Sequence, residues 1–352
     1  MSVTKEVFGT AKDGRTVTAY SIKNEDGSMI RLIDYGAILQ SVLVPDKDGK
    51  MRDAALGYDT VEPYETNPCY FGATIGRNGN RISGAAFSIN GKQYRMTPNE
   101  NGCNNLHSGP DGFEKRIWSA ETGTDSVRFT LHSKDGDQGF PGEADFAVTY
   151  SFTEDHVIRI HYEGTCDQDT VMNLTNHSYW NLNGEGNGLI NDHGLKINAS
   201  AFTAVDAKSI PTGSIVPVEG TPFDFREMKK IGRDAGQSCE QLKNTGGYDH
   251  NFVLDHQHEG LRSAACAQSD ESGISLEVLT DQPGLQFYAG NFISGPKGKQ
   301  GHEYAVHSGF ALESQHYPDS VNQPDFEKPI VRAGEKYDTV TCYVFRSALH
   351  IG

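Results

Sequence analysis

The 352-residue sequence predicts an all-β protein, built as a large antiparallel β-sandwich or as a barrel. Short segments alternate between apolar and polar residues with the period of two that is typical of strands, and turn residues separate these segments. No segment keeps apolar residues at helical spacing over three turns, and the 39 glycines also disfavour long helices. We therefore expect only short helical turns, within residues 225–242.

Tight turns are expected early in the chain, where Asp-Gly pairs stand at positions 13–14, 26–27 and 48–49. Further along, the pair Asn90-Gly91 separates two short segments with strand patterns. A type I′ turn needs positive φ at both of its central residues, which Asn and Gly tolerate best. The sequence therefore predicts a hairpin at 87–94.

Longer strands are expected in the middle of the chain. Large apolar residues occupy every second position in 127–131 and again in 146–152, so each segment has one apolar face. The pair Glu154-Asp155 then predicts a turn into a further strand at 156–162. Since no repeat, low-complexity tract or linker interrupts the sequence, we expect a single domain over residues 1–352.

Acidic residues outnumber basic ones by 47 to 31, which gives a net charge of −16. Such a surface repels phosphate backbones and anionic lipids, so neither a nucleic acid nor a membrane is expected as a partner. The first residues lack the basic and apolar regions of a signal peptide, and no apolar run approaches the roughly 18 residues of a membrane span. We expect a cytoplasmic protein whose six scattered cysteines are reduced.

Several common catalytic motifs are absent. The sequence contains no GxxxxGK[ST], GxGxxG, GxSxG or HExxH pattern, which removes the defining residues of P-loop, Rossmann, serine-hydrolase and zincin sites. His256 and His258 could share one face of a strand and bind a metal, as in cupin-like sheets. Because these histidines lie between an apolar segment and Gly260, a polar hairpin tip is favoured over a metal site.

Two segments combine polar and aromatic side chains in a way typical of carbohydrate sites, where amides and imidazoles bind hydroxyls and aromatic faces cover the ring. Residues 173–182 contain three asparagines, two aromatic residues and His177. In residues 311–319, Glu313 follows an apolar pair and is expected at a strand end that faces a pocket. Considered alone, Glu313 would be a surface carboxylate and His177 a structural histidine.

Taken together, the polar motifs resemble the aldose 1-epimerase family, the galactose mutarotases. The matching segments, in chain order, are GRNGNRI, NLHSGPDGF, NLTNHSYWNL, GYDHNFVL, DQPGLQFYAGN and ALESQHYPDSVNQP, with a closing GEKY. Six ordered motifs are far more specific than one short pattern. The resemblance implies a large antiparallel β-sandwich with an open sugar-binding cleft, and neither a metal nor an organic cofactor.

The resemblance also implies which residues act. It makes Glu313 the general base and His177 the general acid. The residues that it implies for binding the sugar hydroxyls and the ring oxygen are Asn80, Arg81, His107, Tyr179, Asp249 and Gln282. One departure is Ser108, which stands where the family usually has glycine after the histidine and leaves the shape of that loop open.

The implied reaction interconverts the α and β anomers of a free aldohexose such as galactose or glucose. The C1 hydroxyl loses a proton while the ring oxygen gains one, so the ring opens to an aldehyde that rotates and closes again. Glutamate is mostly ionised at pH 7, and a nearby carboxylate can hold a histidine protonated, a role that we expect of Asp249 for His177. A small-molecule aldose is the expected partner, and a monomer or weak homodimer the expected assembly.

Three other functions stay open at this point. A sugar-phosphate epimerase would need a basic pocket, which the net charge of −16 and a single arginine in the predicted site disfavour. A noncatalytic sugar-binding module would tolerate substitution of Glu313 and His177. A metal-dependent β-sandwich enzyme would use His107, His177 and Glu313 as ligands, which a chelator would test.

Overall fold

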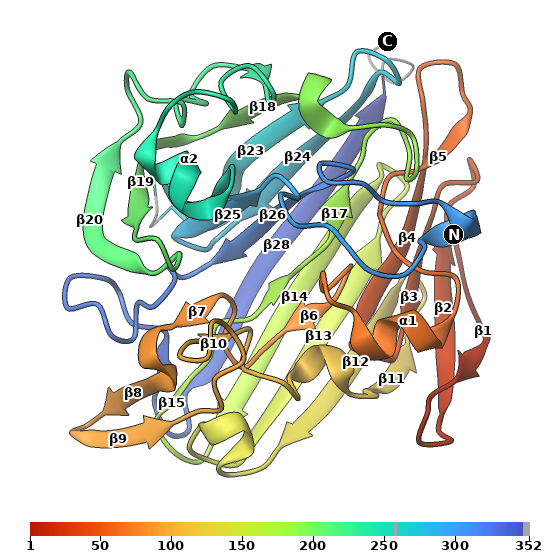
Figure 1. Ribbon diagram of the computed structural model, residues 1–352. Helices are drawn as coiled ribbons and strands as arrows, with labels where there is room; N and C mark the ends of the chain where they lie inside the picture. Colours follow the sequence, from red (N-terminus) through yellow and green to blue (C-terminus); the bar gives the residue numbers. More distant parts are fainter. Residues whose placement is uncertain (257–258, 348–352) are drawn as a thin grey trace.

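A computed structural model describes residues 1–256 and 259–347, and it consists mostly of β-strands (Figure 1). Within these residues there are two α-helices of six residues each, α1 (Val61–Thr66) and α2 (Glu240–Thr245). Neither helix could cross a bilayer, which needs about 20 helical residues. Single turns of 3₁₀ helix lie at Ser83–Ala85, Phe113–Lys115, Asp137–Gly139, Ile190–Asp192 and Lys299–Gly301. The predicted all-β class is confirmed.

The largest sheet has nine strands, each antiparallel to its neighbours. Figure 1 shows its last strand in the sequence lying between β14 and β24, so the C-terminal part of the chain joins two halves of the sheet. In spatial order the strands are β11 (Ser119–Thr122), β12 (Ser126–Ser133), β13 (Ala144–Phe152), β14 (Val157–Cys166), β28 (Lys336–Ser347), β24 (Ile274–Thr280), β23 (Arg262–Gln268), β18 (Gly194–Ile197) and β21 (Lys229–Lys230).

A six-stranded antiparallel sheet contains three of the residues predicted at the site, Tyr179, Asp249 and Glu313. In spatial order its strands are β17 (Tyr179–Trp180), β26 (Phe310–Gln315), β25 (Gly284–Tyr288), β22 (Asp249–Leu254), β19 (Ala199–Val205) and β20 (Pro211–Pro217). The sheet therefore combines strands from distant parts of the chain.

A third sheet is formed by the N-terminal strands in sequence order, β1 (Ser2–Thr10), β2 (Thr16–Lys23), β3 (Met29–Ile33), β4 (Ile38–Pro45) and β5 (Met51–Asp53). The remaining strands form antiparallel pairs. These pairs are β6 (Thr74–Ile75) with β16 (Thr175–Asn176), β7 (Arg81–Ile82) with β10 (Asn105–Leu106), β8 (Ala86–Ile89) with β9 (Lys92–Arg95), and β15 (Thr170–Val171) with β27 (Ile330–Val331).

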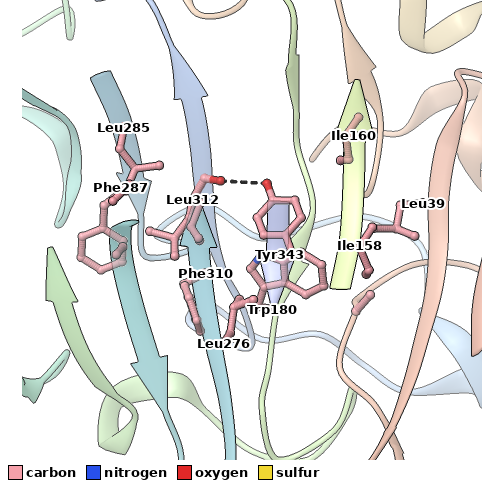
Figure 2. Close-up of a cluster of buried hydrophobic side chains, with 14 of the residues drawn as sticks. Leu39, Ile158, Ile160, Trp180, Leu276, Leu285, Phe287, Phe310, Leu312 and Tyr343 are labelled. Carbon is pink, nitrogen blue, oxygen red and sulfur yellow. Dashed lines mark hydrogen bonds between the residues drawn. The ribbon is translucent and has the colours of Figure 1, made fainter. Parts of the chain in front are cut away.

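Side chains from the three large sheets meet in one apolar core (Figure 2). There the rings of Trp180 and Tyr343 pack edge to face with centroids 5.0 Å apart. The hydroxyl of Tyr343 donates a hydrogen bond to the carbonyl oxygen of Leu312 at 3.0 Å, which satisfies a polar group inside the apolar core. This bond connects β26 of the six-stranded sheet to β28 of the nine-stranded sheet.

The hairpin expected at 87–94 is confirmed as β8 and β9. Asn90 and Gly91 have φ values of 52° and 79°, as a type I′ turn requires, and Ile89 pairs with Lys92 across the turn. The three Asp-Gly pairs near the start of the chain also lie in turns.

The strands expected at 127–131 and 146–152 are confirmed as parts of β12 and β13. The strand expected at 156–162 begins one residue later, because His156 has a φ of 57° and belongs to the turn. Of the segment expected to hold helical turns, only the end overlaps α2.

All six cysteines are free thiols, and three of them are buried.

Of the histidine pair at 256 and 258, His256 is in an exposed turn, where its Nδ1 atom lies 2.9 Å from a carboxylate oxygen of Glu259. His258 lies outside the described residues. The position of His256 agrees with the polar hairpin tip that the sequence favours.

Candidate active site

The register of the six-stranded sheet aligns several polar side chains. Glu313 on β26 lies opposite Gln286 on β25, which in turn lies opposite Asn251 on β22. One row along, Tyr288 lies opposite Asp249. Because alternate residues of a strand point to the same face, these two rows share one face of the sheet. The sheet thus brings two carboxyl groups and an amide from three separate strands close together.

The opposite face of β26 is apolar. Leu312 belongs to the core shown in Figure 2, so the next residue, Glu313, points away from that core. Glu313 lies in the interior of the strand Phe310–Gln315, whereas the sequence analysis expected a strand end. Its backbone is paired within the sheet and further held through the hydrogen bond between Tyr343 and Leu312.

Asn80, Arg81 and His107 reach the site from the small ladder of β7 and β10. The backbone N–H of His107 donates to the carbonyl oxygen of Asn80 at 3.0 Å, and the backbone N–H of Asn80 donates to Nδ1 of the His107 ring, also at 3.0 Å. Asn80 and His107 have φ values of 63° and 52°. Such left-handed conformations are uncommon outside glycine and cluster at functional sites.

The structure shows the shape of the loop at Ser108, the position at which the family usually has glycine. It has a φ of 72° and is buried. Its hydroxyl accepts a hydrogen bond from the backbone N–H of Asn78 at 2.9 Å and donates one to the carbonyl oxygen of the same residue at 3.0 Å. The serine therefore adopts a glycine-like backbone conformation and anchors the loop that contains His107.

These walls enclose a cavity of about 500 Å³, within the usual size range of ligand sites. Its lining includes the exposed residues Lys208, Lys243 and Phe292, the last of which is 64% exposed. Seven of the eight residues expected at the site line the cavity, namely Asn80, Arg81, His107, His177, Tyr179, Asp249 and Glu313. Neither Gln282 nor Gln286 is among the residues that line it.

Gln286, and not Gln282, contacts a residue that lines the cavity. The side chain of Gln282 donates to Asp281 at 3.1 Å, before β25 begins. By contrast, Nε2 of Gln286 donates to Oδ1 of Asp249 at 2.7 Å. The alternation of side chains along β25 distinguishes the two glutamines. Gln286 stands between two buried apolar residues of β25, so its side chain must point to the opposite face of the sheet.

His177 and Glu313 form a close, buried pair. Nε2 of His177 lies 3.6 Å from Oε2 of Glu313, and the two side chains are 6% and 3% exposed. Burial lowers the pKa of His177 to about 4. Burial, together with the nearby charge of Asp249, raises the pKa of Glu313 well above its ordinary value. The environment therefore favours the uncharged form of both side chains.

Asp249 does not hold His177 protonated, which corrects the expectation from the sequence. Its carboxylate lies 3.9 Å from Nη2 of Arg81 and accepts the hydrogen bond from Gln286. Burial raises the pKa of Asp249, and the charge of Arg81 offsets this only in part.

Arg81 is also bound by Glu100, which accepts hydrogen bonds from Nε and Nη2 at 2.8 to 3.0 Å. Glu100 lies in a polar loop, and no local pattern distinguishes it as a site residue.

Two tyrosines lie against His177 inside the cavity. The ring centroid of Tyr179 is 5.1 Å from that of His177, with an angle of 25° between the rings. Tyr70 is stacked at 5.7 Å and 29°. Tyr179 is expected from the sequence to bind sugar, whereas no sequence pattern identifies Tyr70, which stands in a turn between Cys69 and Phe71.

The spacing of His107, His177 and Glu313 would allow a metal ion between them, since one ligand atom from each lies within 4.8 Å of the others. Nδ1 of His107 accepts the backbone N–H of Asn80, which places the proton of a neutral ring on Nε2. A metal ligand needs a lone pair directed at the ion, whereas this tautomer presents a donor. The arrangement fits a sugar oxygen better than a metal ion.

The chain is similar to known proteins along nearly its whole length. The sequence model of the aldose 1-epimerase family matches residues 18–343. The chain is 40% identical over 350 residues to galactose mutarotase from Sus scrofa, covering 99% of this chain and 100% of that protein. It is 40% identical over 343 residues to aldose 1-epimerase from Escherichia coli (strain K12), covering 97% of this chain and 98% of that protein.

Solved structures give the same result. A GalM/aldose epimerase homologue from C. elegans superimposes with a TM-score of 0.86 at 33% identity, covering 93% of this chain and 98% of that one. Galactose 1-epimerase from Lactobacillus acidophilus NCFM has a TM-score of 0.84 at 25% identity, covering 98% of this chain and 99% of that one. Since both the sequence match and the structural match extend over nearly the whole chain, the protein belongs to the aldose 1-epimerase family.

Proposed function

We propose that the protein is an aldose 1-epimerase that interconverts the α and β anomers of a free aldose such as galactose or glucose. The observation that supports this most strongly is the pairing of His177 with Glu313, 3.6 Å apart, on the wall of a cavity of about 500 Å³. Anomer interconversion requires one base and one acid within reach of the same C1–O5 bond. Relatives named for this activity align along the whole chain.

In the proposed reaction, Glu313 takes the proton of the C1 hydroxyl, the C1–O1 bond becomes a carbonyl and the C1–O5 bond breaks. His177 gives its proton to O5, which becomes the C5 hydroxyl of the open chain. Rotation about C1–C2 then presents the other face of the aldehyde. The two residues act in reverse to close the ring, so both return to their starting protonation states.

The protonation states of the pair are consistent with this cycle. The resting environment favours neutral His177 and protonated Glu313, whereas ring opening begins from protonated His177 and ionised Glu313. These two states contain the same number of protons and differ only in which residue holds the shared one. Ring opening itself returns the pair to the neutral arrangement, and neither arrangement adds net charge to the buried site.

Four of the remaining lining residues are proposed to bind the sugar. Arg81, Asn80 and the Nε2–H of His107 present donors to the cavity, and Asp249 presents an acceptor. Gln286 does not line the cavity and is proposed, in place of Gln282, to orient Asp249. We propose a cofactor-free enzyme acting as a single catalytic domain, a monomer or weak homodimer in the cytoplasm, a reducing compartment that suits the six free thiols.

A specific observation supports a second candidate, an epimerase for aldoses with an anionic group. Among the described residues, Lys208 and Lys243 are exposed lysines that line the cavity, whereas Arg81 is engaged by carboxylates. These lysines supply the basic pocket that a sugar phosphate would need. Free aldoses are nevertheless the first choice, because the curated relatives have names of free-sugar epimerases.

Polarimetry of freshly dissolved sugars tests the proposal. We expect catalytic acceleration with α-galactose or α-glucose, smaller acceleration with galactose 6-phosphate, and no change with methyl α-galactoside, whose C1 oxygen has no proton to lose. A chelator should leave the rate unchanged. If the protein accelerates none of the free sugars, the proposed function is wrong; if chelation abolishes activity, the metal-dependent alternative returns.

A further inference from the structure

Two tyrosines present their π faces to the ring of His177, which also lies beside Glu313 and His107. Tyr179 stacks on the imidazole at 5.1 Å and 25°, and Tyr70 at 5.7 Å and 29°. The ring of His107 meets His177 edge-on at 5.2 Å. Stacked rings at these distances bring the negative face of each tyrosine close to the imidazole.

Both tyrosines are held in place by the fold. Tyr179 is 3% exposed, and its ring packs edge-on against Phe71 at 4.9 Å and Tyr288 at 5.9 Å. Tyr70 lies in a turn closed by hydrogen bonds from its N–H to Asn67 and from Ala73 to its carbonyl oxygen. The backbone bonds fix the turn that carries Tyr70, and its ring also packs edge-on against His107 at 4.7 Å, so neither tyrosine depends on a bound sugar for its position.

Few charged groups offset a positive charge on His177. The carboxyl of Glu313, on β26, lies 3.6 Å away, and His107, on the loop after β10, is uncharged because burial holds its pKa well below the ordinary value. Asp249, on β22, and Arg81, on β7, pair with each other and act on Glu313. Burial therefore disfavours the imidazolium form, yet in the proposed reaction His177 must hold a proton before ring opening.

We propose that Tyr70 and Tyr179 are positioning residues that stabilise the protonated form of His177 through their π faces and thereby raise the fraction of the pair that is ready to open the ring. This inference rests on the proposed function, in which His177 is the acid. A desolvated cation over an aromatic face gains appreciable free energy, so the effect is large enough to change a rate. It also gives Tyr179 a role different from that of a sugar ligand.

A graded weakening of the two π faces tests the inference. Phenylalanine and its mono-, di- and trifluorinated analogues are introduced at Tyr70, and separately at Tyr179, because fluorine withdraws charge from the ring face with little change in size. We expect kcat for galactose to fall progressively, by about tenfold over each series, while KM changes less than threefold. The first member of each series, Tyr70→Phe or Tyr179→Phe, should lie within about threefold of the wild type.

The same series at Phe129 is the matched control. This ring lies in the core on β12, packs edge-on with Tyr20 and does not line the cavity, so kcat should not vary. A flat series at both tyrosines in an active enzyme would overturn the inference. A large loss already at Tyr179→Phe, with raised KM, would overturn it in favour of a hydroxyl that binds sugar. A wild-type protein without mutarotase activity would instead remove the proposed function and this inference with it.

Discussion

Nε2 of His177 and Oε2 of Glu313 lie 3.6 Å apart, with the two side chains only 6% and 3% exposed. At this separation the proton balance of one group depends on the other, so the pair titrates as a unit. Burial lowers the pKa of His177 to about 4 and raises the pKa of Glu313 well above its ordinary value. One shared proton is therefore retained over a broad pH range, which is the condition that the proposed acid–base cycle requires.

The first prediction concerns pH. Below about pH 4 the pair gains a second proton, because His177 becomes charged while Glu313 stays protonated, and the base is lost. As pH rises through the raised pKa of Glu313, the shared proton leaves and the acid is lost. Polarimetric kcat should follow a bell-shaped curve with its acidic midpoint near pH 4. A rate that rises steadily with pH would contradict the shared-proton account.

The two glutamines give a matched pair of variants. Gln286→Ala removes the donor to Asp249 and should lower kcat/KM for galactose by about tenfold or more, since hydrogen bonds to charged groups are worth roughly 1.5 to 3 kcal/mol. Gln282→Ala should stay within about twofold of the wild type, because that side chain bonds to Asp281, which does not line the cavity, and not to Asp249. The reverse ranking of the two variants would restore Gln282 to the site.

Arg81 is expected to be required for binding. Arg81→Ala leaves Glu100 and Asp249 without their cation, so galactose affinity measured by isothermal titration should fall at least about tenfold and turnover should fall with it. Arg116→Ala is the control, since Arg116 makes a similarly buried pair with Asp137 outside the cavity. Both variants should lose thermal stability, but only the first should lose affinity; unchanged affinity would make Arg81 a structural residue.

Glu114 gives a prediction about stability. Both of its carboxyl oxygens are buried without a hydrogen-bond partner among the described residues, and burial raises its pKa from 4.5 to about 7. Because the folded-state value is the higher one, its contribution is fully present below about pH 4.5 and is lost as pH rises through 7. Between these limits the folded state should lose about 3 kcal/mol of stability.

The variant Glu114→Gln isolates the pH-dependent contribution of this carboxyl group to stability. It keeps the size of the side chain but cannot ionise, so its unfolding free energy relative to the wild type should increase by about 3 kcal/mol between pH 5 and pH 8. Denaturant unfolding at the two pH values measures the difference. An identical pH dependence in both proteins would show that this carboxyl does not titrate on unfolding.

Local patterns in the sequence predicted the strands well. The period of two in 127–131 and 146–152 and the turn at Asn90-Gly91 depend on neighbouring residues, and the structure contains them where expected. The same local rule, applied to Gly284–Tyr288, would have identified Gln286, whose apolar neighbours face the core. The boundary at His156 differed because a positive φ at that residue is not visible in its pattern.

The electrostatics of the site could not be predicted in the same way. By residue type alone, Asp249 is a suitable counter-charge for His177, but the sheet register places it beside Gln286 and near Arg81. Glu100 reaches Arg81 only because a loop folds back on β7. Such contacts join residues that are distant in sequence, and the resulting pKa shifts depend on burial, which a single sequence does not specify.

The most direct test of the central claim compares turnover and binding in Glu313→Gln. The substitution keeps the shape of the side chain but removes the base, so kcat for galactose in the polarimetric assay should fall at least about 100-fold. Affinity measured by isothermal titration should stay within about threefold of the wild type. A variant that folds, binds galactose and retains a kcat near the wild-type value would contradict the assignment of Glu313 as the base.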